Sequence, residues 1–121
     1  MFRRILILLI LSLIATFTAL AADVAGKWTA SFDTQIGVQN YTYEFKIDAG
    51  KLTGTATGPQ GAVAITESKI DGDNVFFVEN MNYQGMDIRI EYSGKLAGDE
   101  LKLTRKVGEF ATEELVAKRA K

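Results

Sequence analysis

Apolar and polar residues alternate along most of the chain after its first 22 positions. In the range 41–48, tyrosine, phenylalanine and isoleucine alternate with threonine, glutamate and lysine. Successive side chains of a strand point to opposite faces, so this range predicts a strand with one buried face. Ala49-Gly50 then reverses the chain and residues 51–57 return with the same period, which predicts a β-hairpin.

The same period recurs along the chain and predicts eight strands separated by turn-forming residues. The predicted strands are Lys27–Phe32, Tyr41–Asp48, Lys51–Thr57, Ala62–Ile70, Val75–Asn80, Met86–Leu96, Glu100–Lys106 and Glu113–Arg119. Gly94 lies inside the longest strand, Met86–Leu96, and indicates a β-bulge there. The last strand, Glu113–Arg119, also suits a helix, because its residues have good helix propensity.

Sequential hairpins favour an all-β fold, an eight-stranded antiparallel up-and-down barrel. Closure of such a meander removes the exposed strand edges that invite aggregation. Within a barrel of this size the interior is just wide enough for side chains to fill. We therefore expect one domain over residues 23–121.

The first 22 residues have the features of a signal peptide. Arg3 and Arg4 precede an apolar run, and Ala19-Leu20-Ala21 supplies small residues at the spacing of a cleavage site. The alternative is an uncleaved membrane anchor, but a spanning helix needs about 20 mainly apolar residues and Thr16 and Thr18 dilute this run. We expect a secreted or periplasmic protein that has no membrane association after cleavage.

The amino-acid composition limits the reactions and binding partners that are open to this protein. The chain has no His and no Cys, which removes the commonest general base, the thiol nucleophile and the soft metal ligands. Its net charge of −1 offers nothing to attract nucleic acid. The sequence contains no phosphate-binding loop, and Asp71-Gly72-Asp73-Asn74 is typical of a turn rather than a calcium loop. We therefore predict no enzyme activity, no metal and no cofactor.

The candidate ligand site comes from the uneven lengths of the predicted connections. In a meander, the loops 33–40, 58–61, 81–85 and 107–112 fall at one end, and the short turns fall at the other. The long loops are unusually apolar, which indicates a mouth there; the alternative is that these side chains plug the end. The candidate ligand-binding residues are Ile36, Val38, Tyr41, Tyr43, Met81, Tyr83 and Phe110.

Two further groups of residues follow from strand phase. Trp28 and Arg119 both fall at the short-turn end, so Arg119 is expected over the Trp28 ring as a cation–π partner that closes this end. On the hairpin 62–80, the pairing of Ile70 with Val75 places four apolar residues on the outer face, which suggests a homodimer surface. These four are Val63, Ile65, Phe76 and Val78.

Short motifs resemble known families. Gly26-Lys27-Trp28 with Arg119 resembles the G-x-W signature and late arginine of the calycins, which include lipocalins, fatty-acid-binding proteins and avidins. The addition of Leu52-Thr53-Gly54-Thr55 is most similar to avidin, but biotin is stacked between several tryptophans there and this chain has only one. The whole pattern also resembles a family of small exported bacterial proteins without an assigned activity. Its further motifs are Ile70-Asp71-Gly72-Asp73, the range 94–101 and Ala117-Lys118-Arg119.

Two functions fit these observations. The first is an exported protein that binds a small, mainly apolar ligand at the end with the long loops, because the interior is aromatic and the loops are apolar. The second is a protein-binding module, such as an inhibitor of an exported hydrolase, in which the apolar loops project outward. Catalysis ranks last, because the residues that most often perform it are missing.

Overall fold

The computed structural model describes residues 24–120, so the predicted signal peptide lies outside the described residues. All nine regular elements are strands, and within residues 24–120 no helix has the length and apolarity to cross a membrane. The strands are β1 (Gly26–Thr34), β2 (Gly37–Asp48), β3 (Lys51–Gly58), β4 (Gly61–Ala64), β5 (Thr66–Asp71), β6 (Asn74–Tyr83), β7 (Met86–Ala97), β8 (Glu100–Val107) and β9 (Ala111–Arg119).

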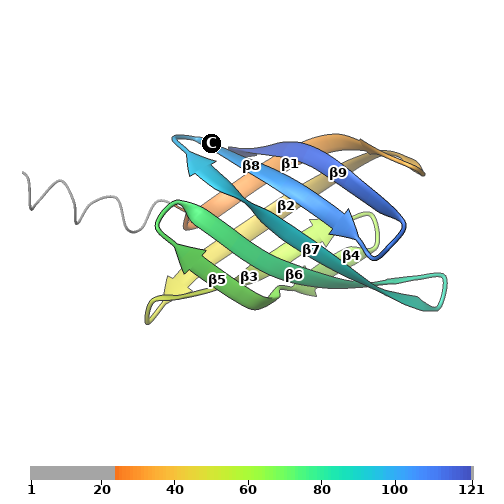
Figure 1. Ribbon diagram of the computed structural model, residues 1–121, viewed down its shortest axis with the longest axis horizontal. Coiled ribbons are helices and arrows are strands. Elements are labelled where there is room, and N and C mark those ends of the chain that lie inside the picture. Colours follow the sequence, from red (N-terminus) through yellow and green to blue (C-terminus); the bar gives the residue numbers. More distant parts are fainter. Residues whose placement is uncertain (1–23, 121) are drawn as a thin grey trace, which may run out of the picture.

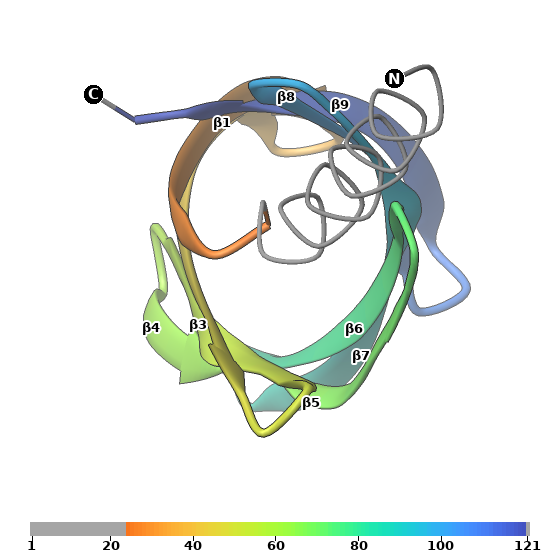
Figure 2. The same ribbon diagram turned by 90° about the vertical axis from the view of Figure 1, so that its left-hand side faces the viewer.

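The strands form one antiparallel sheet in the order β4-β3-β2-β1-β9-β8-β7-β6-β5. Every connection between neighbours in sequence is a hairpin except the link between β4 and β5, and the first strand pairs with the last. The sheet rolls up, so that its two edges approach each other and its inner face encloses the core (Figures 1 and 2). An all-β antiparallel meander is therefore confirmed.

The prediction of a closed, eight-stranded barrel is wrong. The predicted strand Ala62–Ile70 is divided at Ile65 into β4, which pairs with β3, and β5, which pairs with β6. The two edges meet without a continuous ladder of backbone pairs. The Ile65 N–H donates to the Gly54 carbonyl oxygen at 3.0 Å, and the Ser68 hydroxyl donates to the Leu52 carbonyl oxygen.

The core is the aromatic inner face of this rolled sheet. Trp28, Tyr43, Phe77 and Tyr92 have no exposed surface, and rings from β2, β6 and β7 pack together. The rings of Phe77 and Tyr92 stack with their centroids 4.5 Å apart. Such pairs add about 0.5–1.5 kcal/mol each beyond the burial of their area, so the alternating aromatics of the sequence supply much of the core.

The long loops expected at one end are absent; strands continue through them. β1 and β2 extend over most of the range 33–40 and leave only Gln35-Ile36 as a turn, and β6 runs on to Tyr83. β9 begins at Ala111, so only residues 108–110 separate it from β8. Hydrogen bonding between adjacent strands outweighs the weak turn signals of Gln, Asn and Gly in these ranges. The mouth at this end is therefore built from strand ends.

A bulge changes the phase of the strand that was predicted as Ala62–Ile70. The register between β5 and β6 shifts between Thr66 and Lys69, and Glu67 has a φ of 50°. Val63 pairs with the inward-facing Ala56, and Ile65 belongs to the core with 9% of its surface exposed. The single outer patch of Val63, Ile65, Phe76 and Val78 is therefore wrong: the first two face inward, and Val78 is fully buried.

The predicted bulge at Gly94 is also wrong. Gly94 keeps regular register with Val75 on one side and Leu103 on the other. Its role is close approach, because a Cβ atom built there would lie 2.0 Å from the Lys102 carbonyl oxygen. Glycine is required at this position by space, since strand residues with side chains do not fit against that backbone.

Trp28 and Arg119 meet as their strand phases predicted. They are direct cross-strand partners in β1 and β9, and the Arg119 guanidinium carbon lies 4.3 Å from the Trp28 ring centroid. Arg119 also donates to the Asp99 carboxylate at 3.2 Å and to the Ala25 carbonyl oxygen at 3.0 Å. These contacts join the first strand, the last strand and the β7–β8 turn at one end of the sheet.

Candidate functional site

Two charged residues, Glu79 and Arg105, lie inside the rolled sheet, where only 2% and 4% of their surfaces are exposed. Each continues the inward phase of its strand. Glu79 follows Val75 and Phe77 in β6, and Arg105 follows Leu101 and Leu103 in β8. We did not predict either as a site residue, although the period-two alternation carried the signal. Charged side chains are almost never fully buried unless they are paired, so their surroundings need explanation.

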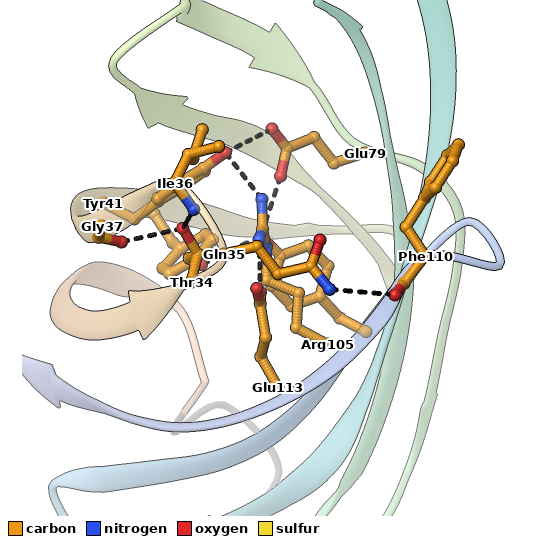
Figure 3. Close-up of polar contacts among 11 residues, drawn as sticks. Thr34, Gln35, Ile36, Gly37, Tyr41, Glu79, Arg105, Phe110 and Glu113 are labelled. Carbon is orange, nitrogen blue, oxygen red and sulfur yellow. Dashed lines mark hydrogen bonds and ion pairs between the residues drawn. The ribbon is translucent and has the colours of Figure 1, made fainter.

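Arg105 is the centre of a network of hydrogen bonds. Its Nε donates to the Tyr92 hydroxyl at 2.9 Å, one terminal nitrogen donates to the Tyr41 hydroxyl at 2.9 Å, and the other donates to Glu113 at 2.6 Å. The guanidinium carbon also lies 5.0 Å from the Tyr41 ring centroid and 5.2 Å from that of Phe32. Figure 3 shows Tyr41 and Glu79 on one side of Arg105 and Glu113 on the other.

Glu79 accepts hydrogen bonds from two tyrosine hydroxyls of this network. The Tyr41 hydroxyl lies 3.0 Å from one of its carboxylate oxygens, and the Tyr92 hydroxyl lies 2.8 Å from the other. A guanidinium has donors only, so the Tyr41 oxygen accepts from Arg105 and its own proton points to Glu79. Tyr43 adds a bond of 3.1 Å to the Tyr92 hydroxyl. The Arg105 guanidinium is therefore joined to the Glu79 carboxyl group through the Tyr41 and Tyr92 hydroxyls, and directly to Glu113.

Burial governs the protonation of this cluster. It raises the pKa of Glu79, and the hydrogen bond from Tyr92 and the charge of Arg105 offset only part of that effect. Burial likewise raises the pKa of the Tyr41, Tyr43 and Tyr92 hydroxyls above their ordinary value of 10.0. For Arg105, burial lowers the pKa, but nearby Tyr92, Tyr41 and Glu113 outweigh it and the pKa is raised. Arg105 therefore stays charged and the tyrosines stay neutral.

Glu113 pairs with Arg105 on the side toward the mouth. It lies in β9, and its side chain is 10% exposed. Its neighbour Glu114 points to the outer face, where it accepts a hydrogen bond from Thr104 at 3.0 Å. The two adjacent carboxylates thus serve different faces, as strand geometry requires.

A pocket of about 270 Å³ lies above this network at the end of the sheet with the β1–β2, β3–β4, β6–β7 and β8–β9 turns. Tyr41, Arg105 and Glu113 form its polar floor, and apolar side chains from four strands and two turns form its walls. The apolar wall residues are Ile36, Met81, Tyr83, Met86, Ile88, Val107, Phe110 and Ala111. Gln35 bridges two turns at the rim, where its side-chain amide donates to the Phe110 carbonyl oxygen at 3.2 Å.

Neighbouring residues fix the orientation of Tyr41 in the floor of the pocket. The Tyr41 ring lies against Gly58 of β3, where an added Cβ would come within 2.5 Å of the ring. On its other side, the Phe32 ring centroid is 5.6 Å away. Tyr41 is therefore held between a glycine and an aromatic ring, and its hydroxyl is directed inward to Glu79 and Arg105.

The predicted ligand-binding residues divide into three groups. Five line the pocket: Ile36, Tyr41, Met81, Tyr83 and Phe110. Tyr43 lies deeper in the core with no exposed surface. Val38 pairs with Asp33 on the outer face and is 61% exposed, because its phase in β2 is opposite to that of Tyr41. Ile36 and Phe110 are 60% and 61% exposed, so these side chains do not plug the end.

The chain has no match among protein-family models, curated proteins or solved structures. The resemblance to calycins, avidins and small exported bacterial proteins therefore stays a prediction carried by the motifs alone. Within residues 24–120, no group of three or more carboxylates is placed to hold a metal ion. The case for function consequently comes from the pocket and its floor.

Proposed function

We propose that this is an exported small β-protein that binds a small, mainly apolar ligand in the pocket above Arg105. The observation that carries this proposal is the pairing of an apolar wall with a fixed polar floor. Ligand pockets are typically lined by apolar and aromatic side chains with a few positioned polar groups. Export is supported by the residues of the predicted signal peptide, and binding rather than catalysis by the mutual pairing of Arg105 and Glu113.

The volume of the pocket limits the size of the ligand that it can enclose. Its volume of about 270 Å³ is close to the lower end of the usual range of about 300–1,000 Å³ for ligand sites. Each water occupies about 30 Å³ in the liquid, so the pocket has room for a molecule of roughly ten non-hydrogen atoms. Long-chain lipids and large cofactors are therefore poor candidates for full enclosure.

Native mass spectrometry of protein purified without denaturation, together with amide NMR titration against small apolar compounds, tests this proposal. Ala111→Trp fills the pocket from β9, whereas Thr112→Trp adds the same ring on the outer face and serves as the control. We expect wild type and the control to bind and Ala111→Trp to lose binding. The absence of both a retained mass and any shift of pocket amides in wild type would contradict a ligand-binding role.

A protein-binding role is the second proposal, supported by exposed apolar side chains around the mouth. Ile36, Val38, Met86 and Phe110 are each more than half exposed. An inhibitor of an exported hydrolase would use such projecting residues as anchors. Pull-down from culture fluid with wild type, Ile36→Ser/Phe110→Ser and the control Val116→Ser tests it. A partner retained equally by all three proteins would rule out this surface.

A further inference from the structure

The floor of the pocket has hydrogen-bonding capacity beyond what the protein uses. A guanidinium carries five N–H donors, and three from Arg105 are used in bonds to Tyr92, Tyr41 and Glu113. Glu113 accepts from Arg105 through Oε1, and no donor among residues 24–120 bonds to its Oε2. Both residues line the pocket. Arg105 and Glu113 lie side by side (Figure 3), so an unused donor and an unused acceptor belong to two neighbouring residues that line the same pocket.

The charges of the floor disfavour a charged ligand. Arg105 is already compensated by Glu113 at 2.6 Å, and Glu79 lies behind it through the two tyrosines. A carboxylate at the floor would lie against the Glu113 carboxylate, and an ammonium group would lie against Arg105. Transfer of either ion from water into a mainly apolar pocket is costly without a free partner of opposite charge. A neutral group that both donates and accepts has no such penalty.

We propose that the pocket takes an uncharged, mainly apolar molecule that ends in a hydroxyl group, a small aliphatic or aromatic alcohol. The hydroxyl donates to Oε2 of Glu113 and accepts from Arg105, while the apolar body contacts the walls formed by Met81, Ile88 and Val107. This inference rests on the proposed ligand-binding function and specifies its ligand class. It also distinguishes this site from one that uses a free arginine to hold an acid.

Four probes of similar length test the inference by calorimetry near neutral pH: 1-octanol, heptyl methyl ether, octanoate and octylamine. The ether has the same number of non-hydrogen atoms as octanol and lacks only the donor. A hydrogen bond to a charged acceptor contributes about 1.5 kcal/mol or more, so octanol is expected to bind about tenfold more tightly than the ether. Octanoate and octylamine are expected to bind more weakly than octanol.

Glu113→Gln and its neighbour Glu114→Gln form a matched pair of variants. In Glu113→Gln the amide oxygen of the new side chain keeps the bond to Arg105, so the NH₂ group replaces Oε2, the acceptor that the protein leaves unused. We expect the octanol-to-ether preference to disappear and octanoate to bind more tightly, because Arg105 loses its compensating charge. Glu114→Gln, on the outer face, leaves all four affinities unchanged. Unchanged ether affinity in Glu113→Gln reports that the pocket is intact.

The outcomes separate this inference from the function on which it rests. If none of the four probes binds, both proposals fail. If octanol and the ether bind equally, or octanoate binds most tightly to wild type, the pocket is a ligand site but the hydroxyl preference is wrong. An unchanged octanol-to-ether ratio in Glu113→Gln would likewise overturn the role of Glu113.

Discussion

At the scale of single residues, the polar network is the feature most dependent on three-dimensional pairing. The alternation in β6 and β8 was enough to place Glu79 and Arg105 on the inner face. Their mutual proximity was not predictable, because it depends on the register of β6 against β7 and of β7 against β8. Charged side chains are rarely buried unless they are paired, and the alternation does not show which partners would pair with these two.

Replacing Arg105 tests the network directly. Arg105→Met keeps an unbranched apolar stem but removes the guanidinium, which leaves Glu79 and Glu113 without their positive partner. Breaking a buried ion pair from one side costs about 3–5 kcal/mol, so we expect a loss of that size in the free energy of unfolding by urea. Lys106→Met, on the exposed face of the same strand, is the control and should change stability by less than about 0.5 kcal/mol. Equal effects of the two variants would contradict the network.

The buried tyrosines predict instability at high pH. Their pKa values are raised above 10.0 only in the folded protein, so above that pH the unfolded state releases protons that the folded state retains. Stability therefore falls as pH rises through about 10, by up to roughly 1.4 kcal/mol per pH unit for each tyrosine. Tyr43→Phe removes one hydroxyl and should make the fall shallower. Urea unfolding at several pH values checks this, and identical slopes would contradict it.

At the scale of elements, the hairpins were predictable and the strand ends were not. Ala49-Gly50, Gly72-Asp73 and Gly98-Asp99 all form turns within the predicted connections. The strands at the other end were predicted too short, because residues such as Gln39 and Asn40 have low β-propensity but gain ladder partners in the folded sheet. A pocket does lie at the end where the long loops were predicted, but strand ends rather than long loops form it.

Gly94 provides a test of close strand packing. In Gly94→Ala the new methyl group would collide with the Lys102 backbone, which cannot move without disturbing β8. We expect a loss of about 3 kcal/mol in unfolding free energy, at the upper end of overpacking effects. Gly98→Ala has open space around the new methyl and only a φ of 66° to accommodate, so it should lose about 1 kcal/mol. Urea denaturation compares the two, and the reverse order would exclude a steric role for Gly94.

At the scale of the whole molecule, one bulge decides how the sheet ends. Ile65 and Ile70 are an odd number of residues apart, so an unbroken strand cannot bury both. The bulge between Thr66 and Lys69 resolves this conflict and turns both toward the core. The odd spacing is visible in the sequence, but an unbroken period-two alternation predicts a single long strand with an outer apolar patch, and both predictions are wrong.

Native-state hydrogen exchange tests the consequence of that bulge for stability. β4 and β5 are the edges of the sheet, and few bonds join β5 and the residue before it to β3, whereas β1 and β9 are flanked on both sides. Elements with few pairing partners open locally at low free energy, so amides of β5 should exchange at least ~100-fold faster than those of β9. Ser68→Ala, which removes the bond to the Leu52 carbonyl, should accelerate exchange in β5 alone. Ser93→Ala, an exposed change in β7, is the control. Uniform protection of all nine strands would instead mean that β3 and β5 are joined as firmly as any other neighbouring pair.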